Sequence, residues 1–534
     1  MTAIDDTRAL GERIAAGERE GRWLEVIELI ATLEESAPVD AAWIVPAMNA
    51  LASYHVVTQP LLLMQHEPER LDLRGIAPGV PPYERWATQA LALGLELGSR
   101  MGAAQSTDPA AVIVLGRLRE AARDVEGCAT IVRRLDALLA PDAVAFFRAR
   151  LAVIAGDLAA GAECFRAVAP MYRAPRVVPI APAAAVEVAA TPTTRLMLYH
   201  EGRTVAHTFA TPQQVPQCDT HVDVEVVGRY CFAIDRQGVA HIDGLVSEPE
   251  QVFRIGALRA NHAGERGARV HVAAWAPHAL LLDVPRPRTR HLSRALLLGS
   301  GYSENYYHWL FEVLPRLALL DDLGDPALRL LVPGPLRPWQ AETLALLGMD
   351  AGRLEVIADD ESVTVGELFA PRTVAREGMV DDWAIAWVRT RLARPADRGS
   401  ARLYLARKSQ LRLLAGDAEV EAAVRARGYT IVEPASRTVA EQIALFADAA
   451  VIAAPTGAAL SNVAFAPAGA QLVSLNPRTF VGPTFLTQAR ACGQDAHVVL
   501  GVEVTGSVQQ PHWGYRVDPA DVVRALEAAE AAAR

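Results

Sequence analysis

The spacing of apolar residues along the chain changes twice, and the two changes divide it into three parts. In residues 1–170 the apolar positions recur at helical spacing, as in residues 23–33, where the run stops before Pro38. Similar spacing over residues 145–168 predicts two helices that separate at Gly156. We therefore expect an all-α domain over residues 1–170.

Small and apolar residues within this domain follow a pattern that resembles a known repeat. Residues 155–167 resemble one helix pair of a tetratricopeptide repeat, and a similar turn occurs at residues 16–23. The period between such turns is not regular, so an irregular helical bundle is the alternative. Prolines among small residues then predict that residues 171–195 form a Pro/Ala-rich linker or an extended strap.

The pattern after the linker is typical of strands, and then of strands that alternate with helices. Alternating runs at residues 221–227 and 230–234 predict antiparallel strands, with a hairpin turn at residues 235–238. From about residue 296, strands and helices take turns, which is the signature of a parallel α/β sheet.

A second α/β block begins near residue 400 and has the same rhythm. We expect two Rossmann-like halves, residues 196–395 and 400–534, with a hinge near residues 395–399. The halves would face a cleft, because ligands bind beyond the carboxyl ends of the strands in such sheets. The strands predicted in the second block are residues 402–405, 429–432, 450–453 and 471–475.

Composition narrows the class of protein. The 534 residues are 51% hydrophobic and 21% charged, which is typical of a globular protein, and the net charge of −10 disfavours broad nucleic-acid binding. The five cysteines form no CxxC pair and no metal-ligand spacing, which favours a reducing compartment. We read no signal peptide and no transmembrane segment. The expected location is the cytoplasm, with peripheral attachment to a membrane as a second option.

One segment of the first half combines polar residues with a core-like background. Read as a helix from Asn305, it places Asn305, His308, Glu312 and Arg316 on one face, at steps of three or four. A buried hydrogen-bonded network is one reading of this face. In the other reading, one residue of this face is a catalytic general base, with His308 as the first candidate and Glu312 as the second. Asn305 or Arg316 would then orient that base.

The second half carries residues suited to an anionic ligand. Gly457 and Ala458 let a ligand approach a strand–helix turn closely, where free amides favour an anion, and Thr456 could cap that helix or donate to a phosphate. Just past the first strand of this half, the cations of residues 407–412 suit a diphosphate. The alternatives are a simple tight turn and a solvated basic loop. These cations are Arg407, Lys408 and Arg412.

Three segments, in this order, resemble glycosyltransferase family 61: residues 305–317, residues 404–408 and residues 445–469. The first and third are specific in combination, and the resemblance covers about residues 200–520. It implies a GT-B architecture, a nucleotide-sugar donor (usually a UDP-sugar), inversion at the anomeric carbon, and neither an obligatory metal nor another cofactor. The absence of an Asp-x-Asp motif is consistent with metal independence.

The resemblance also implies a division of labour. The second half would hold the donor, with Asn462 near the ribose or sugar, and the polar helix would face the acceptor. One motif departs from the family, which usually has His-Gly-Ala-Gly where this chain has Thr-Gly-Ala-Ala at residues 456–459, so that the histidine is lost and the last glycine is an alanine. The loss of this imidazole has three alternative consequences: weaker contact with the diphosphate, a different donor, or an inactive protein.

Three functions therefore compete. The first is a metal-independent inverting glycosyltransferase that moves a sugar to a glycan or protein acceptor. The second is a catalytically inactive binding or scaffold protein of the same fold, with a helical docking domain. The third is another nucleotide-sugar enzyme, such as an epimerase or phosphorylase. The expected partners are the donor and the acceptor, with no nucleic acid, and the N-terminal helices could dock a partner or self-associate.

Overall fold

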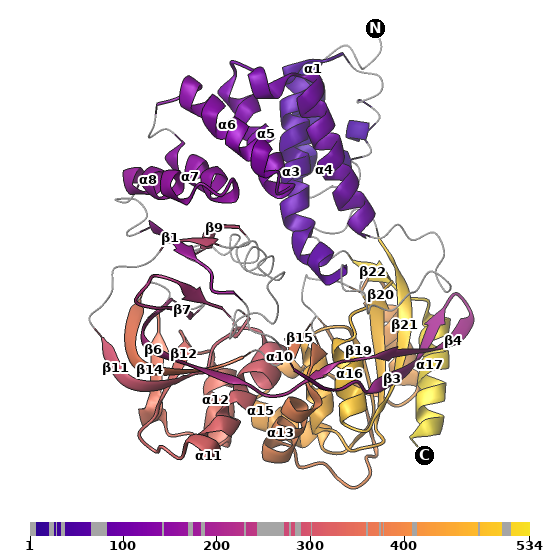
Figure 1. Cartoon of the computed structure of the whole chain (residues 1–534). Helices are drawn as coiled ribbons and strands as arrows, with labels where there is room; N and C mark the ends of the chain where they lie inside the picture. The colour runs from indigo at the N-terminus through magenta and orange to yellow at the C-terminus, as the bar shows by residue number, and fades with distance from the viewer. Residues whose placement is uncertain are drawn as a thin grey trace.

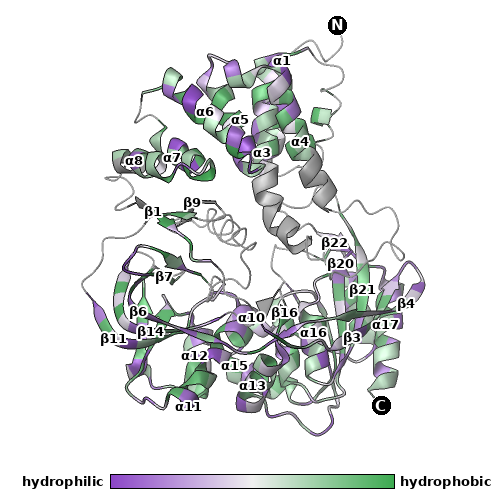
Figure 2. Cartoon of the chain, in the orientation of Figure 1, coloured by the Kyte–Doolittle hydropathy of each residue, from purple (hydrophilic) through white to green (hydrophobic). Residues whose placement is uncertain are grey.

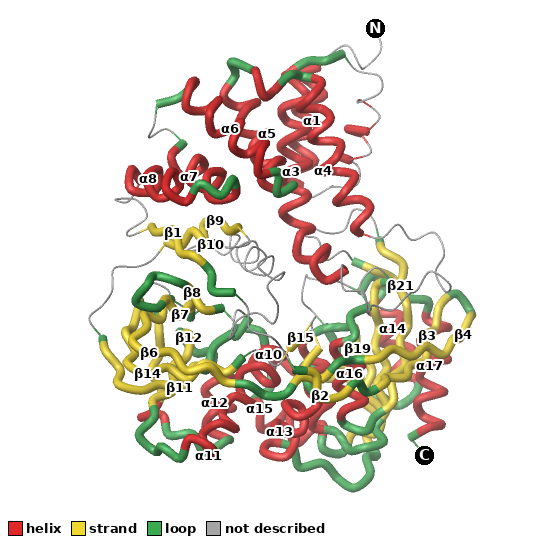
Figure 3. Tube along the Cα trace, in the orientation of Figure 1, coloured by secondary structure: helices red, strands yellow, loops and turns green. Residues whose placement is uncertain are grey.

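The architecture comes from a computed structural model, which describes most of the chain. The residues described are 7–20, 26–27, 29–31, 33, 38–65, 83–140, 144–168, 175–182, 187–228, 231–242, 272–276, 279–283, 290–300, 302–358, 361–372, 375–376, 379–407, 414–478, 481–504 and 514–533. Figure 1 shows a helical part near the N-terminus above a broad part in which sheets and helices alternate. Figure 3 separates the same two parts by secondary structure.

The N-terminal part is all-α, as predicted. Its helices carry both hydrophobic and hydrophilic residues (Figure 2), and all of them except the last contribute apolar residues to one buried cluster. Gly156 adopts φ +82° between the last two helices, at the break that the sequence predicted. The helices are α1 (Thr7–Glu20), α3 (Ala41–Gln65), α4 (Tyr83–Arg100), α5 (Pro109–Ala121), α6 (Val125–Leu138), α7 (Ala145–Ile154) and α8 (Leu158–Val168). No described helix is both long enough and apolar enough to cross a membrane.

A small three-stranded sheet joins the helical part to the rest of the molecule. It consists of β1 (Pro175–Pro179), β10 (Ala279–Asp283) and β9 (Val272–Ala276), paired antiparallel in that order. Successive side chains of a strand point to opposite faces. Leu281 therefore packs with residues of α7, while Leu280 and Leu282 pack with residues of the first large sheet. The predicted linker is thus partly an extended, paired strand.

The first large sheet has seven strands in the order β13-β12-β11-β14-β6-β7-β8. The first four are parallel and the last three antiparallel, as the two successive patterns in the sequence predicted. The strands are β6 (Cys218–Val227), β7 (Phe232–Ile234), β8 (Ala240–His241), β11 (His291–Leu297), β12 (Arg329–Pro333), β13 (Leu354–Ile357) and β14 (Ser362–Pro371).

The second large sheet has the order β18-β17-β19-β20-β21-β3-β4, with β22 (Tyr515–Arg516) also paired to β21. Its four predicted strands are all present. The strands of the main path are β3 (Thr193–His200), β4 (Arg203–Ala210), β17 (Ala401–Leu405), β18 (Thr430–Val432), β19 (Ala449–Pro455), β20 (Gln471–Pro477) and β21 (Asp495–Glu503). The last helix, α17 (Pro519–Ala532), starts as predicted, with Asp518 as its N-cap and Pro519 at its first position.

The expected boundary at residue 196 does not separate the two sheets. The hairpin of β3 and β4 precedes the first sheet in sequence, yet β3 pairs in parallel with β21 of the second sheet. The reason is that β21 offers an unpaired edge whose backbone groups β3 satisfies, and chain order does not restrict which edge a strand joins. The chain then crosses to the first sheet through β5 (Gln213–Gln214).

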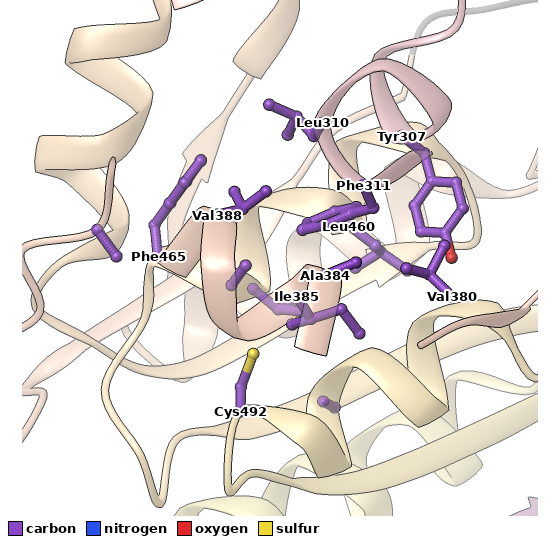
Figure 4. Close-up of a cluster of buried hydrophobic side chains, with 14 of the residues drawn as sticks. Tyr307, Leu310, Phe311, Val380, Ala384, Ile385, Val388, Leu460, Phe465 and Cys492 are labelled. Atoms are coloured by element: carbon purple, nitrogen blue, oxygen red, sulfur yellow. The ribbon is translucent and has the colours of Figure 1, made fainter. Parts of the chain in front are cut away.

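The two sheets share one interior. A single cluster of buried apolar residues runs from Leu310 and Phe311 of the first half to Leu460 and Phe465 of the second. Helix α13 (Asp382–Leu392) lies between them, and Figure 4 shows its Ile385 and Val388 among these side chains. The two halves are therefore packed together where the polar segment meets the second sheet.

We predict that truncating Phe311 destabilises the whole α/β region. Its side chain is fully buried, so Phe311→Ala should lower the free energy of unfolding by about 3–5 kcal/mol, measured by chemical denaturation. The control is Leu346→Ala, whose side chain is 44% exposed and whose change should stay within about 0.5 kcal/mol. Equal effects of the two substitutions would contradict a shared interior.

A buried carboxyl group lies where the chain enters α13. Asp381 is 3% exposed; its Oδ1 accepts a hydrogen bond from Gln214 N at 2.8 Å, and its Oδ2 has no hydrogen-bond partner in the described structure. Burial, opposed by the Gln214 bond and reinforced by Asp382, raises the pKa of Asp381 to about 7. The folded protein therefore holds this proton at pH values where the unfolded chain has released it.

This carboxyl group should make stability depend on pH with a definite sign. Because its folded pKa lies above the unfolded value of 3.8, stability falls as pH rises from about 4 to about 7, by at most about 1.4 kcal/mol per pH unit. Asp381→Asn should remove this slope, which denaturation of both proteins across the window measures. The exposed Asp397→Asn is the matched control. A constant difference between wild type and Asp381→Asn from pH 4 to 7 would show that the group does not titrate there.

Candidate functional site

The segment that carries the predicted polar face is not a regular α-helix. It begins as α10 (Tyr306–His308), widens into the π-helical turn η3 (Trp309–Val313), tightens into the 3₁₀ turn η4 (Leu314–Ala318) and ends as α11 (Leu319–Leu323). Pro315 lies in the first turn of η4, where its missing N–H is tolerated. π-helical turns occur frequently at functional sites.

Three of the four predicted polar residues meet. His308 Nδ1 lies 2.6 Å from Glu312 Oε1, and Arg316 Nε donates to the backbone oxygen of Glu312 at 2.9 Å. Asn305 does not join them, because its side chain caps α10 by accepting a hydrogen bond from Tyr307 N at 2.9 Å. The polar face is therefore a His–Glu–Arg row with a structural cap at its start.

The surroundings of His308 fix the orientation of its ring. Tyr302 stacks on the imidazole with ring centroids 4.9 Å apart, and Tyr307 meets it edge-on at 5.4 Å. The contact with Glu312 places the proton on Nδ1 and leaves the lone pair on Nε2. Nε2 makes no hydrogen bond with the part of the chain that the structure describes, and the side chain is 23% exposed. His308 therefore presents an unused basic nitrogen at a partly open position.

A buried acid and a buried base lie behind His308. Glu312 and Arg316 are 4% and 1% exposed, and burial lowers the pKa of Arg316 to about 10, although Glu312 opposes this shift. The guanidinium therefore stays charged at neutral pH. Burial also raises the pKa of the nearby thiols of Cys218 and Cys231, to about 11 and about 12. These thiols therefore stay neutral at neutral pH.

The predicted donor side is also brought together in part. Arg407 follows β17, and Thr456 and Gly457 follow the parallel neighbouring strand β19, so the carboxyl ends of both strands meet. Arg407 Nη1 donates to the carbonyl of Thr456, and a Cβ built on Gly457 would lie 2.3 Å from that nitrogen. Burial lowers the pKa of Arg407, opposed by Tyr515. Lys408 and Arg412 lie outside the described residues.

Thr456 does not cap the helix that follows. That helix is the 3₁₀ helix η7 (Ala458–Phe465), its N-cap is Gly457, and no side chain caps it. Thr456 is 3% exposed, and its backbone N–H is bonded to Leu475 O at 2.8 Å. The N-cap prediction is wrong because the chain stays extended through Gly457, at φ 167°, and turns one residue later than expected. Ala458 is then the first helical residue.

Asn462 connects the two halves. It is fully buried: its Oδ1 accepts a hydrogen bond from Tyr306 of α10 at 3.1 Å, and its Nδ2 donates to Gln442 of α15 (Val439–Phe446) at 2.8 Å. These bonds occupy the amide that the sequence suggested for a ribose or sugar. Its position shows instead that η7 links the two predicted parts of the site, since η7 begins beside Arg407 and contacts α10 at its middle.

A second connection joins the halves beside the first. Glu342, from α12 (Pro338–Leu346), accepts hydrogen bonds from Val439 N at 2.8 Å and Ala440 N at 2.9 Å, the first two amides of α15. A carboxylate is favourable at a helix N-terminus. The described residues contain no group of three or more His, Cys, Asp or Glu side chains placed to hold a metal ion.

Sequence reasoning missed several residues of this region. Tyr302 and Tyr307 could have been found, since aromatic residues flank His308 within six positions of the chain. Glu342 and Gln442 could not, because they come from separate elements and are polar residues on otherwise ordinary amphipathic helices.

Part of the chain matches a model of a known protein family. Residues 306–473 match the family model described as Glycosyltransferase 61. The matched range begins in α10 and ends in β20, so it includes His308, Glu312, Arg407 and Thr456. A search of the curated proteins finds no match.

Proposed function

Because this chain is a glycosyltransferase with a family 61 domain over residues 306–473, we propose that it transfers a sugar with inversion from a nucleotide-sugar, most simply a UDP-sugar, to a hydroxyl of a glycan or protein acceptor. The proposal includes a GT-B arrangement, in which the second sheet serves the donor and the first serves the acceptor. It also includes independence from metal ions. The observation that supports it most is the contact of His308 Nδ1 with Glu312, which leaves Nε2 as a base at a partly open position.

The first step requires a base beside the acceptor. A sugar hydroxyl is a weak nucleophile until its proton is removed, and His308 Nε2 is the group that takes this proton as the C–O bond forms. Glu312 acts through His308: it fixes the tautomer and stabilises the imidazolium, as the carboxylate does in a Ser-His-Asp triad. Arg316 Nε donates to the backbone oxygen of Glu312 and so helps to hold the turn that carries this carboxylate. Glu312 is therefore a positioning residue in this mechanism, rather than an alternative base.

The second requirement is stabilisation of the leaving nucleoside diphosphate. Its negative charge grows as the bond to the anomeric carbon breaks, and attack from the opposite face inverts that carbon. Arg407 and the first amides of η7 lie together at the carboxyl ends of β17 and β19, where ligands of parallel sheets bind. With Thr456 in place of the usual family histidine, Arg407 supplies the positive charge. Lys408, Arg412 and the Thr456 hydroxyl remain part of this proposal.

The alternative is an inactive protein of the same family, and Thr456 is the observation that favours it. The ordered His308–Glu312–Arg316 row favours activity, because an inactive copy would not need to hold two charges and a fixed imidazole in a costly environment. Assays of nucleotide release separate the possibilities. A transferase releases nucleoside diphosphate when acceptor is present, an inactive copy binds without turnover, and an epimerase or phosphorylase converts the donor without acceptor.

We predict that His308→Ala lowers turnover by at least ~10²-fold while donor affinity stays nearly unchanged, since a general base contributes to the chemical step and not to donor binding. Glu312→Gln should lower kcat less than His308→Ala does and change its pH profile. Steady-state kinetics and calorimetry with the donor measure both effects. Glu304→Gln, a carboxylate just before α10 that pairs with Arg337, is the matched control. Normal turnover in His308→Ala would contradict the assignment of His308 as the general base.

We predict that two different substitutions weaken donor binding through the same guanidinium. Arg407→Ala removes it, and Gly457→Ala displaces it, because the new methyl group overlaps Arg407 Nη1. Either change should raise the Kd for UDP or the cognate nucleotide by about tenfold or more, the value of one hydrogen bond to a charged group. Arg402→Ala, from the other end of β17, is the control. Unchanged Kd in both variants would contradict the phosphate assignment.

A further inference from the structure

A separate cavity opens at the end of the first sheet opposite to His308. It has a volume of about 310 Å³, within the range of small-molecule sites, and it is lined by α11, the turn that precedes β12, the end of α12 and α13. Pro326 lies three residues before β12, and Arg353 directly precedes β13, which is parallel to β12, so the cavity lies at the amino ends of both strands. His308 follows the carboxyl end of β11, which is parallel to both strands. The cavity is therefore distinct from the candidate site.

Part of the lining of the cavity, which we call the floor, is apolar and partly accessible. Leu317 and Leu320 contribute from η4 and α11, and Trp387 contributes from α13. Leu317 belongs to the main buried cluster, and Leu320 and Trp387 pack against that cluster while remaining partly accessible. Exposed apolar surface in a concave position gains free energy when a ligand covers it.

The charges at the rim compensate one another. Arg391 Nη2 donates to Asp321 Oδ2 at 3.1 Å, and its guanidinium lies over the Trp387 ring, 5.4 Å from the centroid. Arg353 Nε donates to Leu328 O at 3.1 Å, and the Asp325 carboxylate pairs with Arg294. Two acids and two bases line the cavity, so it offers no net charge to a phosphate or another strong anion. It does offer carboxylate acceptors and fixed guanidinium donors to a neutral ligand.

An apolar floor with a neutral, hydrogen-bonding rim fits one class of ligand. A saccharide unit has a face of C–H groups and an edge of hydroxyls that both donate and accept, whereas a nucleotide brings charge and an alkyl chain brings no hydrogen bonds. We propose that this cavity is a second, non-catalytic saccharide-binding site, which holds a unit of the acceptor or product glycan away from His308. The choice of a saccharide as the ligand rests on the proposed transferase function, whereas the existence of the cavity does not depend on it.

The test is whether neutral mono- and oligosaccharides bind to the full-length chain. Saturation-transfer NMR detects the binding, and titration measures its affinity. Wild type and His308→Ala should bind a member of the panel equally, because the cavity lies apart from the base. Arg391→Gln and Trp387→Phe should each weaken binding by about tenfold or more. Arg391 is largely exposed, so its substitution should leave the fold intact even if the Trp387 variant proves unstable.

The possible outcomes separate this inference from the proposed function. If Arg391→Gln weakens saccharide binding and the wild-type protein shows no turnover, the saccharide site is supported and the transferase mechanism is contradicted. Absence of binding across the panel, or binding undiminished in Arg391→Gln and Trp387→Phe, would overturn the cavity site whatever the turnover. Binding that UDP displaces would place the saccharide at the donor side and would likewise overturn it.

Discussion

The burial of Glu312 and Arg316 in the turn that follows α10 is the constraint on which the rest of this molecule depends. Charged groups removed from water are costly, and the bonds from Glu312 to His308 and from Arg316 Nε to Glu312 O leave the turn that carries them little freedom to move. The π-helical turn and Pro315 set that geometry locally. His308, one turn earlier, is held by its contact with Glu312, and its second nitrogen is left without a hydrogen bond to the described part of the chain.

The same segment makes the two halves one body. Its apolar side packs into the cluster that includes α13 and η7, and its Tyr306 bonds to Asn462 of the second half. Glu342 adds a bond to the start of α15 beside it. Any movement of one sheet relative to the other would have to break these polar contacts and expose part of a shared apolar interior. His308 and the turn at Thr456 and Gly457, proposed as the base and the anion site, are therefore held in one relation through η7.

The helical part is built differently. It has its own buried cluster and reaches the α/β region through the small sheet of β1, β10 and β9, whose two faces pack on different partners. A three-stranded sheet covered on both faces is a stiffer connection than a proline-rich linker would be. The helices thus have a defined place on the molecule, which is what a domain for docking a partner or a second copy requires.

The sequence alone determined the local elements and the chemical candidates. Period-2 and helical spacing placed many strands of both sheets, but not β3, β4, β14 or β21. Gly156 separated two helices, His308 and Glu312 were identified on one face of a predicted helix, and Arg407 was identified at the end of a predicted strand. Only the tertiary structure decided that β3 joins the far sheet and that Asn462 is buried between the halves. Local patterns report which face of an element avoids water, because that depends on neighbours in the chain. Which edge a strand joins, and whether the amide of Asn462 meets a ligand or another side chain, depends on residues that are distant in the sequence, such as Tyr306, which lies 156 positions from Asn462.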